Sequence, residues 1–259
     1  IAIGDNLLIY PWIRRVVRVN KSFIVQRSLQ MREMLMSSAR MSRYMHYAIN
    51  VKKENIWIAQ REGRAKDSND RTQDSILKMM AMGGEGDVIE SLTDLHIVPL
   101  SISYEYDPCD FLKAKEFQQK RDNPDYVKTR EDDLRNMQTG IFGYKGHVHY
   151  KPAPCLDEWL AKLDSRIHRN EIFDIIAKHI DREIYKGYCL YPGNYAAADL
   201  LLGDKRFAGK YSEQELQNFE KYIASRIEMV DLPDKDTAFL RERLLTMYAN
   251  PVINKERAL

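Results

Sequence analysis

The chain has 259 residues, of which 44% are hydrophobic and 30% are charged. This is enough for one substantial core and a smaller appendage, because domains typically hold roughly 100–200 residues. The net charge of +2 favours neither a nucleic-acid binder nor an acidic tail. Charged residues interrupt every hydrophobic run before it reaches the ~18 residues that a membrane span needs, so we expect any membrane contact to be peripheral.

Strand and helix patterns alternate in the first part of the chain. Short apolar runs predict strands at residues 1–4, 23–25, 56–59 and 97–104. Helical spacing predicts an amphipathic segment at 11–19, a long helix from Ser28, a helix at 73–82 that stops at Gly83, and a helix from Asp87. We interpret the methionine stripe of the long helix as core-facing. This order predicts an α/β fold, a mostly parallel sheet flanked by helices.

Beyond one more expected strand at 147–150, the chain becomes helical. Periodicity predicts helices at 158–163, 171–185, 213–229 and 237–248. We therefore expect an α/β domain over residues 1–185 and a helical C-terminal extension over 186–259. The first residue is Ile1 and not methionine, and the opening residues look like the tail of a strand, so we expect the N-terminus of the protein to lie upstream.

Three cysteines, Cys109, Cys155 and Cys189, are widely spaced and form no Cys-x-x-Cys pair. Their number and spacing favour a reducing compartment over a disulfide framework. The same spacing argues against structural zinc.

The most informative stretch is the loop at residues 60–67, Gln-Arg-Glu-Gly-Arg-Ala-Lys-Asp. It follows an expected buried strand, and open α/β sheets bind ligands at the ends of their strands. Glycine permits close backbone approach, and the three cations supply charge-assisted hydrogen bonds, which suits a phosphate or carboxylate headgroup. Arg27 ends the preceding strand, so we expect it to meet this loop at one rim of the sheet. An ordinary solvated charged loop is the alternative.

Three blocks occur in a characteristic order. Residues 23–27 form a hydrophobic strand ending in Arg27, residues 58–64 read Ile-Ala-Gln-Arg-Glu-Gly-Arg, and residues 97–102 are a strand with an embedded Pro99. Together they resemble the glycerol-phosphate and lysophosphatidic acid acyltransferase superfamily, and the following Tyr104-Glu105 resembles its glycerol-phosphate branch. The likeness covers about residues 1–185.

The resemblance implies a glycerolipid O-acyltransferase of phospholipid biosynthesis. Such an enzyme moves a fatty acyl group from acyl-CoA or acyl-carrier protein to the hydroxyl of a lysophosphatidic acid or glycerol-phosphate acceptor, and needs no cofactor. The expected substrate-binding residues are Arg27, Arg61, Glu62, Gly63, Arg64 and Lys66, with Glu62 in a supporting role and Pro99 as a structural residue. Here Gly63 directly precedes Arg64, whereas the family has one residue between Gly and Arg, so the phosphate contact stays open between Arg64 and Lys66.

The family's catalytic pair, His followed by four residues and then Asp, is absent from this sequence. The six histidines, His46, His96, His147, His149, His168 and His179, are followed five positions later by Val51, Ser101, Pro152, Pro154, Phe173 and Ile184. The resemblance implies that the pair lies upstream of Ile1, with His as general base and Asp orienting its ring. We therefore expect no catalytic residue in this chain and no activity from the chain alone.

Two further groups carry weaker signals. His147 and His149 alternate on an expected strand and share a face, but a third metal ligand is not evident, so we expect a plain strand and no metal. Three carboxylates, Glu105, Asp107 and Asp110, surround Pro108, and we expect them in a solvated turn.

Residues 11–18 combine Trp12 with the basic residues Arg14, Arg15 and Arg18. This composition is typical of a segment at an anionic bilayer surface, and equally of a surface helix packed on a sheet. Combined with the resemblance, it predicts a cytoplasmic protein, peripheral at the inner face of the membrane. The alternatives are an O-acyltransferase for an aminolipid, a noncatalytic anionic-lipid binding module and, as an outlier, a phosphotransferase or nuclease.

Overall fold

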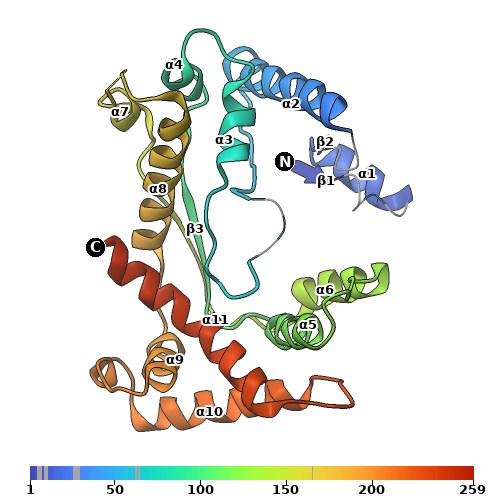
Figure 1. Ribbon diagram of the computed structural model, residues 1–259, viewed down its shortest axis with the longest axis vertical. Coiled ribbons are helices and arrows are strands. Elements are labelled where there is room, and N and C mark those ends of the chain that lie inside the picture. The colour runs from blue at the N-terminus through green and yellow to red at the C-terminus, as the bar shows by residue number, and fades with distance from the viewer. Residues whose placement is uncertain (5–7, 9–10, 26–29, 62, 64, 165) are drawn as a thin grey trace. The chain divides into compact units, whose positions relative to one another are not determined.

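The computed structural model describes residues 1–4, 8, 11–25, 30–61, 63, 65–164 and 166–259. It is 59% helical and 6% strand (Figure 1). The expected α/β fold with a mostly parallel sheet is therefore wrong. Within the described residues, no helix is both long enough and apolar enough to cross a bilayer.

The described strands form two separate sheets of two strands each. The strands β1 (Ala2–Gly4) and β2 (Phe23–Val25) pair in parallel, whereas β3 (Leu100–Tyr104) and β4 (Val148–Pro152) pair antiparallel. The segment 56–59 is not a strand; a single backbone hydrogen bond, from Ala2 N to Trp57 O at 3.0 Å, ties it to β1. An apolar run indicates burial but does not specify which neighbour supplies the hydrogen bonds, and this is why the sequence led to the wrong sheet.

Helices make up most of the remaining structure. They are α1 (Pro11–Val19), α2 (Met31–His46), the π-helical turn η2 (Tyr47–Val51), α3 (Asp74–Ala81), α4 (Val88–Thr93), α5 (Asp110–Asp122), α6 (Arg130–Phe142), α7 (Asp157–Leu160), α8 (Arg169–Gly187), α9 (Pro192–Leu202), the 3₁₀ turn η3 (Ala208–Lys210), α10 (Glu213–Glu228) and α11 (Thr237–Ala258).

The chain divides into two compact units, each built from three segments. The first unit comprises Ile1–Gly63, Arg71–Pro99 and Pro154–Asp181, and the second comprises Arg64–Asp70, Leu100–Ala153 and Arg182–Leu259. The expected division into an acyltransferase domain over 1–185 and an extension over 186–259 stays a prediction.

In the first unit, α2 and α3 lie in close contact. The buried Ser42 hydroxyl donates to Met80 O at 2.6 Å and accepts from Gly83 N at 2.8 Å. A Cβ at Gly83 would lie 2.3 Å from the backbone nitrogen of Arg43, so only glycine permits this approach. The methionine stripe faces inward only at the end of α2: Met45 is 1% exposed, whereas Met31 is 77% exposed, which corrects the expected core-facing stripe.

The core of the second unit surrounds α11. This helix packs against α5, α9 and α10 and buries residues around most of its circumference, including Leu240, Leu244 and Val252. It continues ten residues beyond its expected end at Tyr248, through Pro251, since Val252, Asn254 and Ala258 are buried. Packing therefore outweighs the single backbone hydrogen bond that proline removes.

Three helices of the second unit, α5, α6 and α9, were not expected from the sequence. The buried face of α5 includes Asp110, Glu116 and Gln118, so its apolar periodicity is weak. No residue of α6 is buried. Pro192 occupies the first turn of α9, where its fixed φ and missing N–H cost nothing.

Candidate functional site

The cationic loop, residues 60–67, belongs to a longer segment whose two ends are held together by backbone and side-chain contacts within the first unit. Gln73 N donates to Gln60 O at 2.9 Å, and Thr72 donates from its backbone N and its hydroxyl to Asp181 Oδ1 at 2.8 and 2.6 Å. Helix α3 begins at the next residue, Asp74. The residues on the two sides of the loop, Gln60 and Thr72–Gln73, are therefore held in place by hydrogen bonds within the first unit.

Gly63 adopts a left-handed backbone conformation, with φ of +74°, and a Cβ there would meet no atom within 4 Å. The requirement for glycine at this position is therefore one of backbone conformation and not of space. Arg61, two residues earlier, is half-buried. The other expected headgroup residues of this region, Arg27, Glu62 and Arg64, lie outside the described residues, so their expected convergence stays a prediction.

Within the second unit, the segment 65–70 is held by three helices. Asn250 Nδ2 of α11 donates to Asp67 O at 2.7 Å, and Tyr185 Oη of α8 donates to Asp70 O at 2.5 Å. Lys66 is ion-paired with Glu116 of α5, whose carboxylate also contacts Lys120 at 3.1 Å. These contacts give the segment a defined conformation in the absence of a ligand.

The Lys66 ammonium therefore already has a counter-charge, the Glu116 carboxylate. Burial lowers the pKa of Lys66, against the effect of Glu116. Burial acts to raise the pKa of Glu116, but hydrogen bonds and charge from Lys66 and Lys120 lower it overall. An anionic headgroup at Lys66 would have to compete with the Glu116 carboxylate.

Pro99, the expected structural residue, is buried and directly precedes β3. A proline at this position donates no hydrogen bond to a ladder, so it fits the residue before a strand. His147 and His149 flank the start of β4, and His147 Nδ1 lies 2.7 Å from Glu105 Oε2.

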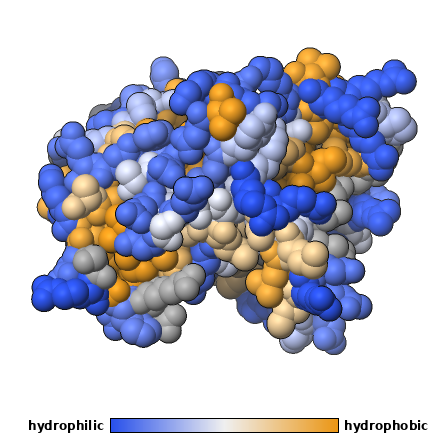
Figure 2. Space-filling model, turned by 90° about the horizontal axis from the view of Figure 1, so that it is seen from above, coloured by the Kyte–Doolittle hydropathy of each residue, from blue (hydrophilic) through white to orange (hydrophobic). Residues whose placement is uncertain are grey.

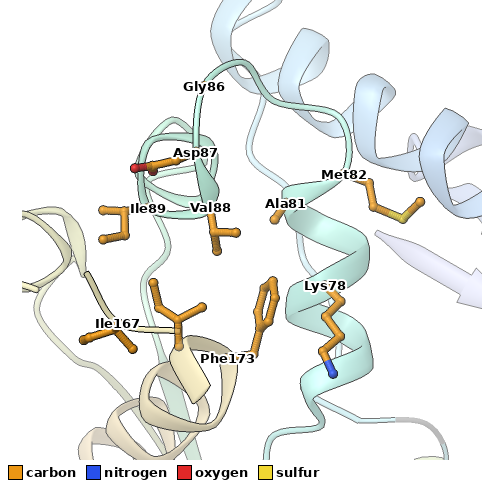
Figure 3. Close-up of a pocket in the computed structure, with 10 residues that line it drawn as sticks. Lys78, Ala81, Met82, Gly86, Asp87, Val88, Ile89, Ile167 and Phe173 are labelled. Atoms are coloured by element: carbon orange, nitrogen blue, oxygen red, sulfur yellow. The ribbon is translucent and has the colours of Figure 1, made fainter. Parts of the chain in front are cut away.

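A cleft of about 660 Å³ lies within the first unit, between α3, α4 and α8 (Figure 3). Seven of its ten lining residues are apolar, and Val88, Ile89, Ile167 and Phe173 are directed into the space, but polar atoms contribute nearly half of the exposed wall. Lys78 of α3 brings one cationic side chain to the cleft, and its Nζ lies 5.6 Å from the centroid of the Phe173 ring. The volume falls within the ~300–1,000 Å³ of small-molecule pockets. The arrangement suits a ligand with an apolar body and an anionic end.

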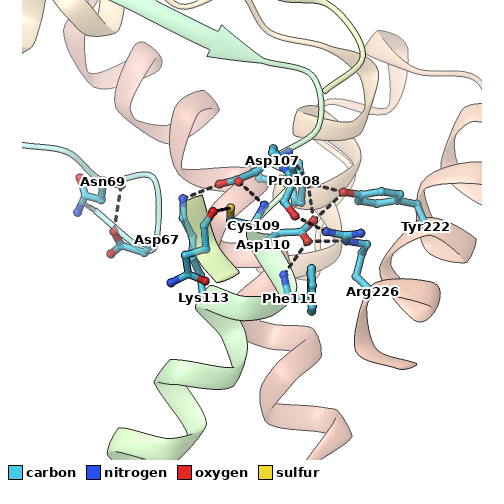
Figure 4. A network of polar contacts seen from close by, with 12 residues as sticks. Asp67, Asn69, Asp107, Pro108, Cys109, Asp110, Phe111, Lys113, Tyr222 and Arg226 are labelled. Atoms are coloured by element: carbon cyan, nitrogen blue, oxygen red, sulfur yellow. Dashed lines mark hydrogen bonds and ion pairs between the residues drawn. The ribbon is translucent and has the colours of Figure 1, made fainter. Parts of the chain in front are cut away.

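Two polar clusters were missed by the sequence analysis. The first lies in the second unit, where Asp110 is fully buried and contacts Tyr222, Tyr248 and Arg226 (Figure 4). The expected solvated turn is thus wrong for Asp110, which is buried because α10 and α11 supply donors from far along the chain.

The second cluster lies in the first unit and combines His96, Cys155 and Asp157, whose side-chain ligand atoms all lie within 4.8 Å of one another. The residues belong to two segments distant in sequence and follow no spacing rule for metal ligands. No sequence signal could have found this group.

No protein-family model, curated protein or solved structure matches this chain.

Proposed function

We propose that this chain is the acceptor-binding part of a glycerolipid O-acyltransferase. In the reaction, the acceptor hydroxyl attacks the thioester carbonyl of acyl-CoA or acyl-carrier protein; a new ester bond forms, the C–S bond breaks and the thiol leaves. The acceptor is a lysophosphatidic acid or glycerol phosphate, whose phosphate binds the cationic loop.

The observation that carries the proposal is the cationic loop at residues 60–67 and its place in the order of the three blocks. Its glycine has the left-handed conformation that a tight cationic turn requires, at the position where the acyltransferase block has its glycine. Arg61 and Arg64 flank it, and guanidinium groups bind phosphate bidentately. Charge-assisted hydrogen bonds of this kind orient the acceptor through its phosphate. Its hydroxyl then stays free to be deprotonated by the family's general base, the histidine.

The apolar cleft supports the second substrate of this reaction. Helix α3, which carries Lys78 and Ala81 into the cleft wall, starts where the loop closes at Gln73. A fatty acyl chain fits a wall of Val, Ile and Phe side chains, and the Lys78 ammonium suits an anionic group at the other end of the ligand.

Helix α1 supports docking at the membrane that holds such lipids. Its exposed apolar residues Trp12, Val16 and Val19 recur at i, i+4 and i+7, and hence lie on one stripe. Arg14, Arg15 and Arg18 are exposed on the same helix. At about 3.6 residues per turn Arg15 borders the stripe, and Arg18 and Arg14 lie farther round the helix. Figure 2 shows hydrophobic side chains at the surface among hydrophilic ones. An anionic bilayer matches both the apolar stripe and the positive charge.

The test is acyl transfer by the full-length product of the gene that encodes this chain, assayed with a panel of lysolipid acceptors. The proposal requires a His-x-x-x-x-Asp pair in that product. Arg64→Ala should raise the acceptor KM about ten- to a hundredfold, because a charge-assisted hydrogen bond is worth about 1.5–3 kcal/mol. The matched control is Arg241→Ala on α11, which should leave the KM unchanged. Unchanged kinetics of Arg64→Ala with a phosphate-bearing acceptor would count against the assignment.

A noncatalytic anionic-lipid binding module is the second candidate, favoured by the basic apolar helix α1. It predicts vesicle binding by the full-length gene product without turnover of any thioester. An aminolipid acceptor predicts turnover that does not depend on a phosphate in the acceptor.

A further inference from the structure

The geometry points to a metal site that is independent of acyl transfer: we propose that His96, Cys155 and Asp157 together bind one Zn²⁺ ion. They supply three different donor types, an imidazole nitrogen, a sulfur and a carboxylate oxygen. His96 Nδ1 and Asp157 Oδ2 are 2.6 Å apart, within hydrogen-bond distance. Zinc takes the place of the hydrogen-bonding proton and of the thiol proton, because its ligands must be deprotonated.

Both segments that carry the ligands are fixed by their neighbours. Leu156, between two of the ligands, is 1% exposed, and its backbone N donates to Ile97 O at 2.9 Å. Helix α4, which leads to His96, also packs against α7, which starts at Asp157. The ligands are therefore held together by the core before any ion arrives, which lowers the entropic cost of binding.

Two local features indicate that the cluster is more than a chance surface contact. His96 has a φ of +47°, a left-handed conformation that a residue with a Cβ rarely adopts and that is often found at functional sites. The Asp157 Oδ1 atom is buried and has no hydrogen-bond donor in the described part of the chain. A buried carboxylate oxygen without a donor gains a partner when a cation binds.

The donor set selects the ion. A thiolate disfavours Mg²⁺ and Ca²⁺, which prefer oxygen, and sulfur with imidazole and carboxylate suits the borderline Zn²⁺ ion. His96 and Cys155 are exposed, so water can complete a tetrahedral site with three protein ligands. Zinc bound here joins the segment that follows α4 to the start of α7, and α4 itself lines the apolar cleft.

The experiment uses the chain after chelator treatment and dialysis, without an affinity tag that binds metal. Titration with Zn²⁺ against a chromogenic chelator should give one ion per chain. Cys155→Ser and Asp157→Asn should each weaken the affinity by at least about tenfold, since even residues that only support a zinc ligand contribute ten- to a hundredfold. Cys189→Ser is the matched control and should bind zinc like the unchanged chain.

Two further readouts identify the ligands directly. Co²⁺ should produce a thiolate-to-metal charge-transfer band that Cys155→Ser abolishes, and Zn²⁺ should protect Cys155 from alkylation without protecting Cys189. Near-ultraviolet circular dichroism of each variant checks that it is folded. Binding of less than one equivalent by the folded unchanged chain, or alkylation of Cys155 at the same rate with and without Zn²⁺, overturns the proposal.

Discussion

Asp110 Oδ1 accepts a hydrogen bond of 2.5 Å from Arg226 Nε, which joins the first turn of α5 to α10 in the second unit. The other carboxylate oxygen accepts from Tyr222 and Tyr248, each at 2.7 Å. Burial, and then the charge of Asp110, raises the pKa of both tyrosines, so both hydroxyls keep their protons as donors at neutral pH. Burial raises the pKa of Asp110, and the charge of Arg226 and the two tyrosine hydroxyls act against that rise, so four side chains share one network (Figure 4).

Asp110→Asn should destabilise the folded chain by about 3–5 kcal/mol, because it leaves the Arg226 guanidinium buried without its counter-charge. Urea unfolding followed by circular dichroism measures the change in the free energy of unfolding. The double variant Asp110→Asn, Arg226→Met should be less destabilised than Asp110→Asn alone. Lys178→Ala, which removes an exposed ion pair with Asp174, serves as the control and should have little effect. Equal losses in the single and double variants would show that the pair is not coupled.

Glu116 gives a pH-dependent contribution whose sign follows from its lowered pKa. The folded state binds the Glu116 proton less readily than the unfolded state, whose carboxyl has the ordinary pKa of 4.5. The stabilisation is therefore complete above that pH and is lost as the pH falls through the folded-state pKa. Glu116→Gln should cost about 1.5–3 kcal/mol near pH 7 and progressively less below about pH 4.5.

Urea unfolding of both proteins at a series of pH values measures this difference. The exposed Glu131 of α6 supplies the control, because Glu131→Gln should show no such convergence with the unchanged chain. A Glu116→Gln difference that stays constant from neutral to acid pH would mean that the Lys66 and Glu116 charges do not interact in the folded state.

Gly63→Ala tests the conformation of the cationic loop. An alanine at a φ of +74° should cost about 1–2 kcal/mol in the free energy of unfolding, although there is space for its methyl group. Gly209→Ala is the matched control, since it also has open space around it but a φ outside the left-handed region. Gly209→Ala should be neutral or should stabilise the folded chain by about 0.4–1 kcal/mol. Identical urea midpoints for the two variants would rule out a left-handed conformation at Gly63.

Local signals in the sequence predicted many elements correctly. Asp87 caps α4 and forms a capping box with Glu90, and α3 ends just before Gly83, as expected. The strands β3 and β4 and the C-terminal helices α8, α10 and α11 also occur near their expected places. These features depend on residues close together in the chain, which is why composition and spacing reveal them.

Apart from the helices α5, α6 and α9 and the methionine stripe of α2, the errors concern contacts between distant residues. Strand β3 pairs with β4, which follows about forty residues later, and Asp110 is buried only because Arg226 and Tyr248 reach it. Hydrophobic periodicity contains no information on such partners. The same holds for the site: the sequence identified the cationic loop, but not the Glu116 carboxylate that pairs with Lys66, and not the meeting of His96 with Cys155.

The basic face of α1 predicts salt-sensitive binding to anionic vesicles. Replacing Arg14, Arg15 and Arg18 by Gln should weaken binding to phosphatidylserine-containing vesicles about a hundredfold at low salt, because each cation near such a surface is worth about 1 kcal/mol. Trp12→Ala should weaken binding to anionic and neutral vesicles alike, since Trp12 is 61% exposed and acts through apolar contact. The arginine effect should fade at high salt, where charges are screened, and the tryptophan effect should remain. Vesicle sedimentation measures the bound fraction. The control variant replaces Arg166, Arg206 and Arg241 by Gln, and so removes three charges away from α1. A loss of binding as large in this control as in the α1 variant would assign the binding to overall charge and not to α1.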